Sequence, residues 1–227
     1  MTDAGHEFRM EVVANHLRES AAVKQRTLEY CTTSILSAAD LITESFRNGG
    51  KLLLCGNGGS AADCQHMAAE LTCRLSAEIA RTGLPAIALT TDTSFLTAYA
   101  NDFDFDDVFA RHAQALGKPG DVLLGISTSG NSKNVIRAFE TAKSIGMRTV
   151  ALSGSSGGNL KELADVAICV PSDNTHHIQE AHLAIEHIIC RLVECDLFGE
   201  HEVPVKLLTK AMHVNALVAP RIERTSN

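Results

Sequence analysis

The sequence lacks several features that mark particular classes of protein. It has no tryptophan, only two tyrosines and no run of Lys and Arg, and its net charge is −7. Nucleic-acid binding usually requires clustered basic side chains or stacking aromatic rings, so we expect no nucleic-acid partner. No apolar run is long enough to span a bilayer, and the start of the chain has neither the basic nor the apolar region of a signal peptide. We therefore expect a cytoplasmic protein with no membrane partner.

Paired cysteines are also lacking. The chain has seven cysteines, an odd number, and none belongs to a C-x-x-C motif. Most lie in apolar patterns typical of buried helices or strands. We expect reduced, mostly buried thiols rather than a disulfide framework or a thiolate metal site.

The chain does have enough apolar residues, 45% of 227, for one substantial core. Five short apolar runs show no clear alternation, and helical patterns separate most of them. The sequence therefore predicts an α/β domain with a five-stranded parallel sheet covered by helices on both faces. The expected strands are 52–55, 86–89, 121–126, 149–152 and 166–170, and the expected helices are 60–80, 105–117, 132–145 and 175–197, with a short turn of helix at 158–164.

The two ends of the chain differ from this pattern. Over about 7–48 the apolar residues recur at helical spacing, which predicts two helices, the second ended by the Asn-Gly-Gly at 48–50. We expect one domain over 1–198 and a C-terminal extension over 199–227, with a short helix at 204–217.

Two loops follow the first and third expected strands and lead into helices. The first, 55–63, has three glycines, which predict either a tight turn with Ser60 as N-cap or a close approach of the backbone to an anion. The second, 126–132, has more hydroxyls than a helix cap needs. Each hydroxyl can donate to a phosphate oxygen beside a helix N-terminus, so this loop predicts a phosphate site. The four hydroxyl residues are Ser127, Thr128, Ser129 and Ser132.

The order of the strands decides whether these loops meet. In the common order 2-1-3-4-5, strands 1 and 3 are neighbours at the switch point where ligands bind. The two loops would then face each other across one crevice. Neither loop carries the lysine of a P-loop, and the first does not match G-x-G-x-x-G, so we expect a small anionic substrate rather than a nucleotide.

Acid, base and metal candidates lie on two of the expected helices. His66 and Glu70 are four residues apart and share one helix face. A His–Glu pair is common on solvated helices, but this one lies within two turns of a possible phosphate loop. A carboxylate and an imidazole could transfer protons in an aldose–ketose isomerisation or hold a divalent metal. The last helix carries further candidates on or near one side, namely Gln179, His182, Glu186 and His187.

Asn101 and Asp102 open an acidic stretch after an expected strand and short helix. An acidic residue at a helix N-terminus is favoured by the helix dipole alone. Spacing does not decide between that role and a place in the site.

Four long segments resemble the phosphoheptose isomerase family, which is of the SIS type. They are 55–71, 86–109, 120–138 and 171–190, and the similarity runs from about residue 10 to 198. The resemblance implies a flavodoxin-like SIS fold, N-terminal helices that assemble a homotetramer, and active sites between subunits. It also implies a sugar-phosphate substrate and the conversion of sedoheptulose 7-phosphate to D-glycero-D-manno-heptose 7-phosphate.

The resemblance also implies roles for individual residues. It assigns phosphate binding to Ser127, Thr128, Ser129 and Ser132, and substrate binding to Asn57, Gly58, Gly59, Ser60, Glu70, Asn101, Asp102 and Gln179. It makes Glu70 and His187 the acid–base pair. It implies one zinc per subunit, with the ligands His66, Glu70, Gln179 and His187. Glu70 and His187 are thus assigned both proton transfer and metal binding. His182 is expected to be a packed helix residue.

Two departures from the family pattern stand out. His176 and His177 lie where other members often carry small, acidic or basic residues, and 199–227 is longer than a typical end. Two other functions stay open: a non-catalytic SIS protein, either a sugar-phosphate sensor or a DnaA-binding replication factor, and an isomerase of another sugar phosphate in a secondary-metabolite pathway. The replication-factor group lacks the acid–base pair, so Glu70 and His187 favour an enzyme.

Overall fold

The computed structural model describes residues 3–199, and the helix expected at 204–217 lies outside them. The described chain forms a fully parallel five-stranded sheet of order β2-β1-β3-β4-β5, which confirms the predicted sheet and strand order. No helix within these residues is long and apolar enough to cross a membrane. The elements are α1 (Asp3–Arg47), β1 (Leu52–Gly56), α2 (Gly59–Thr72), β2 (Ala86–Ala88), α3 (Thr93–Asp102), the 3-10 helix η1 (Phe105–Asp107), α4 (Val108–Leu116), β3 (Val122–Ser127), α5 (Lys133–Ile145), β4 (Arg148–Ser153), α6 (Gly158–Leu163), β5 (Val166–Cys169) and α7 (Thr175–Phe198).

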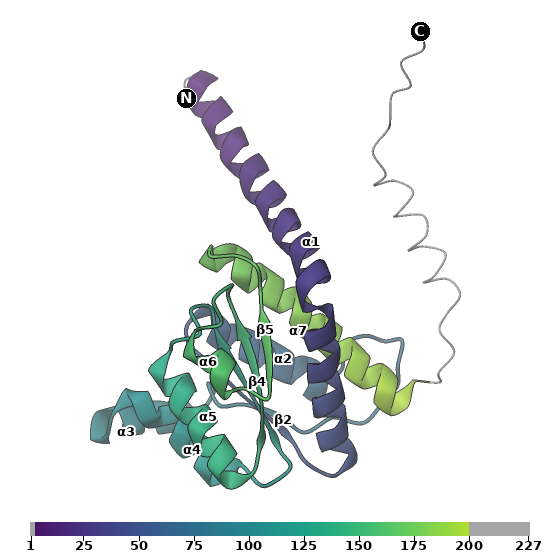
Figure 1. The fold of residues 1–227 in the computed structure, drawn as a ribbon, viewed down its shortest axis with the longest axis vertical. Coiled ribbons are helices and arrows are strands. Elements are labelled where there is room, and N and C mark those ends of the chain that lie inside the picture. Colours follow the sequence, from purple (N-terminus) through teal and green to yellow (C-terminus); the bar gives the residue numbers. More distant parts are fainter. Residues whose placement is uncertain (1–2, 200–227) are drawn as a thin grey trace.

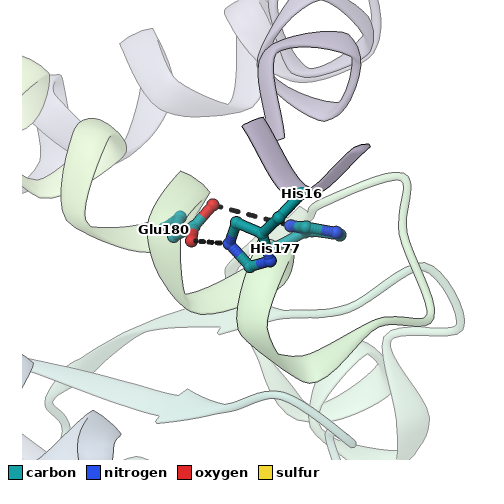
Figure 2. Close-up of side chains that lie close together, drawn as sticks. All are labelled: His16, His177 and Glu180. Carbon is teal, nitrogen blue, oxygen red and sulfur yellow. Dashed lines mark hydrogen bonds and ion pairs between the residues drawn. The ribbon is translucent and has the colours of Figure 1, made fainter. Parts of the chain in front are cut away.

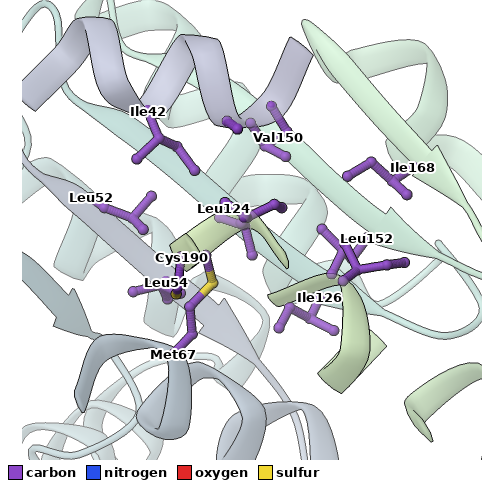
Figure 3. Packing of buried hydrophobic residues seen from close by; sticks show 14 of the residues in the cluster. Ile42, Leu52, Leu54, Met67, Leu124, Ile126, Val150, Leu152, Ile168 and Cys190 are labelled. Atoms are coloured by element: carbon purple, nitrogen blue, oxygen red, sulfur yellow. The ribbon is translucent and has the colours of Figure 1, made fainter. Parts of the chain in front are cut away.

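The sheet is the middle of three layers (Figure 1). Successive strand residues point to opposite faces, so Leu52 and Leu54 pack with α1, α2 and α7, whereas Leu53 packs with α4, α5 and α6. Figure 3 shows the first of these cores, with Ile42, Met67 and other apolar side chains gathered around the strands. Both faces are therefore apolar, as the uninterrupted strand patterns predicted.

The N-terminal region is one helix of 45 residues, so the prediction of two helices was wrong. The segment has no proline and no glycine after Gly5, and nothing else in it breaks the hydrogen-bond ladder. Its C-terminal half packs on the sheet and α7 through residues such as Ile35 and Ile42. Its first turns project beyond the other elements (Figure 1), and Phe8 and Leu17 are exposed.

Helix α2 ends at Thr72, whereas the sequence pattern predicted a helix to residue 80. The cause is Arg81, whose guanidinium donates to the carbonyl oxygens of Glu70 and Leu71, each at 2.8 Å. These bonds satisfy carbonyls that lack an intrahelical partner at the helix end, and the Leu71 carbonyl also accepts from the N–H of Leu84 at 3.0 Å. The helix expected at 105–117 also begins differently, with the 3-10 turn η1.

All seven cysteines are free, and four of them are buried, which confirms that the thiols are mostly buried. Burial raises the pKa of the Cys55 and Cys190 thiols well above the ordinary value. Those two thiols therefore stay protonated and act as small apolar side chains.

Candidate functional site

The hydroxyl-rich loop forms a cup between β3 and α5. The hydroxyl of Ser127 lies 2.9 Å from that of Ser132 and 3.4 Å from that of Ser129. Ser132 is the N-cap residue of α5, but its side chain makes no capping bond. The hydroxyls therefore cluster at a helix N-terminus, where backbone N–H groups and the helix dipole favour an anion.

A neighbouring turn fixes the shape of this cup. Gly130 has a φ of +66°, and a Cβ there would lie 2.0 Å from the carbonyl oxygen of Gly157, so no other residue fits. The backbone N–H of Gly154 donates to the carbonyl of Thr128 at 2.9 Å. A polar cavity of about 340 Å³ opens beside the loop, lined by Thr128, Ser129 and Asn131 together with residues after β4 and β5 and the first turn of α7.

The glycine-rich loop lies beside the cup. Asn57 and Asn134 exchange two side-chain hydrogen bonds of 2.9 Å, which join the loop after β1 to α5. The N-cap of α2 is Gly58, with φ +56° and ψ −121°, rather than the predicted Ser60, which is buried in the first turn. A residue with a side chain is strained at this φ. The capping prediction was therefore wrong.

Helix α7 reaches over this loop. A Cβ on Gly59 would lie 2.5 Å from Nε2 of Gln179, so the carboxamide of Gln179 lies directly against the start of α2. Thr175 and Ile178, in the first turn of α7, line the cavity beside the cup. Both loops and the N-terminal part of α7 thus border one region at the carboxyl ends of the strands.

The structure brings His66, Glu70 and His187 together. The Nε2 atoms of the two histidines lie 2.8 Å apart, and Nε2 of His66 lies 3.7 Å from Oε1 of Glu70. The other oxygen of Glu70 is buried and makes no hydrogen bond within residues 3–199. This group has two imidazoles that can exchange a proton and a carboxylate with an unused oxygen.

The same three side chains fit a metal. Their nitrogen and oxygen donors lie within 4.8 Å of one another. Two imidazoles and a carboxylate are a donor set that divalent zinc accepts, and the unpartnered oxygen of Glu70 is free to be a ligand. Gln179 lies about two helical turns from His187 on α7, against Gly59.

Two carboxyl groups lie near this cluster, the buried Glu186 and the half-buried Asp63. Burial, followed by the charge of Asp63, raises the pKa of Glu186 to about 9. Burial also raises the pKa of Asp63, whereas the charge of His66 lowers it. Neither oxygen of Glu186 has a hydrogen-bond partner in the described chain, so Glu186 is neutral near pH 7.

Asn101 and Asp102 lie apart from these groups. They end α3, which has no buried residue and projects from the body of the molecule (Figure 1). Both are exposed, and the amide of Asn101 donates to Asp102 at 2.8 Å. The structure gives them no contact with the loops or with the His–Glu cluster within the single described chain.

His182 is the packed residue that the sequence predicted. It is fully buried, its Nε2 lies 3.2 Å from the carbonyl oxygen of Ser153, and burial lowers its pKa to about 4. It is therefore neutral at pH 7.

Arg81 was missed by the sequence reasoning. It forms a fully buried ion pair with Glu194 at 2.7 Å while it holds the end of α2, directly after Glu70. Assigning its loop to a helix hid its role, and its partner lies 113 residues away. The nearby Gly83 and Pro85 were the one local sign that the segment of Arg81 is a loop rather than a helix.

Comparisons with known proteins agree with this architecture. The SIS domain family matches residues 15–154. A phosphoheptose isomerase from Roseiflexus sp. (strain RS-1) is 53% identical over 188 residues, which are 83% of this chain and 94% of the relative. The structure of phosphoheptose isomerase from Neisseria gonorrhoeae superposes with a TM-score of 0.77 at 45% identity, over 82% of this chain and 98% of that one. A phosphoheptose isomerase from Francisella tularensis gives a TM-score of 0.78 at 38% identity, with the same coverage.

These similarities span nearly the whole length of each relative. The chain belongs to the phosphoheptose isomerase family of SIS-domain proteins.

Proposed function

We propose that this protein interconverts sedoheptulose 7-phosphate and D-glycero-D-manno-heptose 7-phosphate. The observation that carries the proposal is the pairing of a hydroxyl cup at the start of α5 with a His–Glu cluster on α2 and α7. A sugar phosphate needs both an anion site and a proton-transfer pair. The relatives at about half identity are named as phosphoheptose isomerases, which favours this function over a sensor or a replication factor.

The phosphate would bind the hydroxyls of the cup and the N-terminal N–H groups of α5. We assign this role to Ser127, Thr128, Ser129 and Ser132. The sugar would extend towards the glycine-rich loop, where we assign substrate contacts to Asn57, Gly58, Gly59, Ser60 and Gln179. Asn101 and Asp102 complete the proposed set, and their position on a projecting helix suits a site formed between subunits.

The proton transfer uses Glu70 and His187. The carboxylate of Glu70 removes a proton from C1 of the open-chain ketose, the C1–C2 double bond forms, and His187 gives a proton to O2. The enediol then collapses: His187 takes the proton from O1, the C1 aldehyde forms, and Glu70 returns a proton to C2. One oxygen of Glu70 makes no hydrogen bond within residues 3–199, so in the chain without metal it is available to take this proton.

A zinc ion is part of the proposal, with His66, Glu70, Gln179 and His187 as its ligands. When bound, a divalent metal would polarise the sugar oxygens on C1 and C2. In the chain without metal, the contact of 2.8 Å between the Nε2 atoms of His66 and His187 orients His187.

We also propose a homotetramer in the cytoplasm. An apolar groove of about 300 Å³ runs between α1 and α7, lined by residues such as Leu28, Leu36 and Ile188. All three are exposed in the single chain, as are Val12 and Leu17 further along α1. Exposed apolar area of this kind marks a protein interface, and a second copy of the chain is the proposed occupant. The seven free cysteines suit a reducing compartment.

The test is an isomerisation assay over a panel of sugar phosphates, with and without added zinc. We expect turnover of sedoheptulose 7-phosphate and weaker turnover of pentose and hexose phosphates. Ser132→Ala should raise KM about tenfold, the effect of one lost charge-assisted hydrogen bond. Ser144→Ala, at the other end of α5, should leave KM unchanged. An inert wild type, or preference for another sugar phosphate, would contradict the proposal.

A further inference from the structure

A second group of histidines and a glutamate lies away from the site described above. Figure 2 shows His16 of α1 beside His177 and Glu180 of α7. Nε2 of His16 lies 2.7 Å from one oxygen of Glu180, and Nδ1 of His177 lies 3.5 Å from the other. The two imidazole rings have centroids 4.6 Å apart. Residues 164 positions apart in the sequence thus converge on one carboxylate.

The chemistry of the group goes beyond an ion pair. The His177 side chain is only 8% exposed, and its Nδ1 makes no hydrogen bond within residues 3–199. The same is true of the Glu180 oxygen that faces it. These two buried atoms face each other at 3.5 Å, which is too long for a good hydrogen bond. Buried atoms of this kind call for an explanation, an unseen ion among them.

The carboxylate is prepared for a cation. His16 contacts one oxygen of Glu180 at 2.7 Å, and the hydroxyl of Ser20 donates to the same carboxylate. The hydroxyl of Ser20 in turn accepts from Lys24 at 2.9 Å. These contacts fix the orientation of the Glu180 carboxylate, as hydrogen bonds to metal ligands commonly do.

We infer that His16, His177 and Glu180 form a second site for a divalent cation of the zinc class. Their donor atoms lie within 4.8 Å of one another, so small side-chain rotations bring all three to the bond length of about 2 Å that zinc requires. His16 is 44% exposed, which leaves room for water as a fourth ligand. Imidazole ligands favour zinc over magnesium or calcium.

A cation held here would fasten the N-terminal part of α1 to the start of α7. The first turn of α7 also supplies Thr175 and Ile178 to the cavity beside the phosphate cup. The site would therefore stabilise the position of α1 and of one wall of the cavity without contributing to proton transfer.

The test measures zinc bound per chain in full-length protein that has been stripped with a chelator and then titrated with zinc. We expect His16→Ala and His177→Ala each to bind one zinc fewer than the wild type. His176→Ala is the matched control, because His176 is the exposed neighbour of His177 and its imidazole makes no hydrogen bond or ion pair within residues 3–199. His16 is partly exposed, so its replacement should leave the fold intact even if the His177 variant unfolds.

Cobalt gives a second measurement in the His66→Ala background, which removes a ligand of the other cluster. We expect visible absorption bands of nitrogen- and oxygen-bound cobalt that disappear on the further change His16→Ala. Equal zinc content in wild type, His16→Ala and His176→Ala would overturn the inference. Because the readout is metal content, this result is independent of whether the protein isomerises any sugar.

Discussion

The two His–Glu clusters contain the same residue types in different hydrogen-bonded arrangements. In the first, His66 and His187 contact each other at 2.8 Å, and Glu70 lies 3.7 Å away with one buried oxygen unused. In the second, the carboxylate of Glu180 is bound directly by His16 at 2.7 Å and by Ser20. A carboxylate that already has strong partners is a poor base. The comparison therefore assigns proton transfer to the first cluster and a stabilising role to the second.

The largest expected effect separates the two glutamates. Glu70→Gln should lower kcat by about 10²–10⁴-fold, the usual contribution of a general base, because the amide cannot accept the C1 proton. Glu180→Gln should lower kcat less than tenfold. Steady-state assays with sedoheptulose 7-phosphate measure both, with the exposed Glu140→Gln as the control. Equal losses at Glu70 and Glu180 would remove the distinction between the clusters.

The next effect concerns how each cluster is anchored. Arg81→Met should cost about 3–5 kcal/mol of unfolding free energy, because it leaves the buried Glu194 unpaired and frees the end of α2 after Glu70. Lys24→Ala, which removes the contact to Ser20 beside the second cluster, should cost under about 1 kcal/mol. Urea unfolding followed by circular dichroism gives both values. Equal losses of unfolding free energy in Arg81→Met and Lys24→Ala would contradict the different anchoring of the two clusters.

His182 lies on α7 between the two clusters and belongs to neither. Its pKa is about 4 in the folded state and 6.5 in the unfolded state, so the unfolded chain binds a proton first as the pH falls. The contribution of His182 to the free energy of unfolding is fully present above pH 6.5. It falls by up to about 3 kcal/mol between pH 6.5 and 4. Urea unfolding over this range should show a smaller fall in His182→Gln. An unchanged pH dependence would mean that His182 is protonated in the fold.

The smallest effect is the acid stability of the second cluster. The pKa of Glu180 is about 2 when folded against an ordinary 4.5, so its contribution is present above pH 4.5 and lost as the pH falls towards 2. More than a third of the side chain is exposed, and solvent screening limits the contribution to under about 1 kcal/mol. Between pH 4.5 and 2, Glu180→Gln should lose less stability than the wild type in urea unfolding. A steeper loss in the variant would contradict this.

The parts of the fold that are local in sequence could be predicted. The strands are short apolar runs, and the strand order follows from common α/β topology. The single long α1 was not predicted, because its apolar residues fall in two groups although nothing breaks the helix between them. The end of α2 depends on Arg81, whose role is visible only once Glu194 is beside it.

The two clusters also differ in how far the sequence could predict them. His66 and Glu70 share a helix face, so their proximity could be predicted from spacing. His187 joined them only through the family resemblance, because spacing did not separate it from His182. The second cluster was not predicted, since His16 and Glu180 are 164 residues apart and meet only through the packing of α1 on α7.

The most direct test of the proposed chemistry follows the wild-type reaction in D₂O by NMR, starting from sedoheptulose 7-phosphate. Proton transfer through an enediol predicts an aldose product with deuterium at C2, and deuterium at C1 of the ketose that remains. Neither should form in Glu70→Gln, while Glu180→Gln should behave as the wild type. Absence of conversion, or conversion that leaves both sugars free of deuterium after prolonged incubation, would contradict the account.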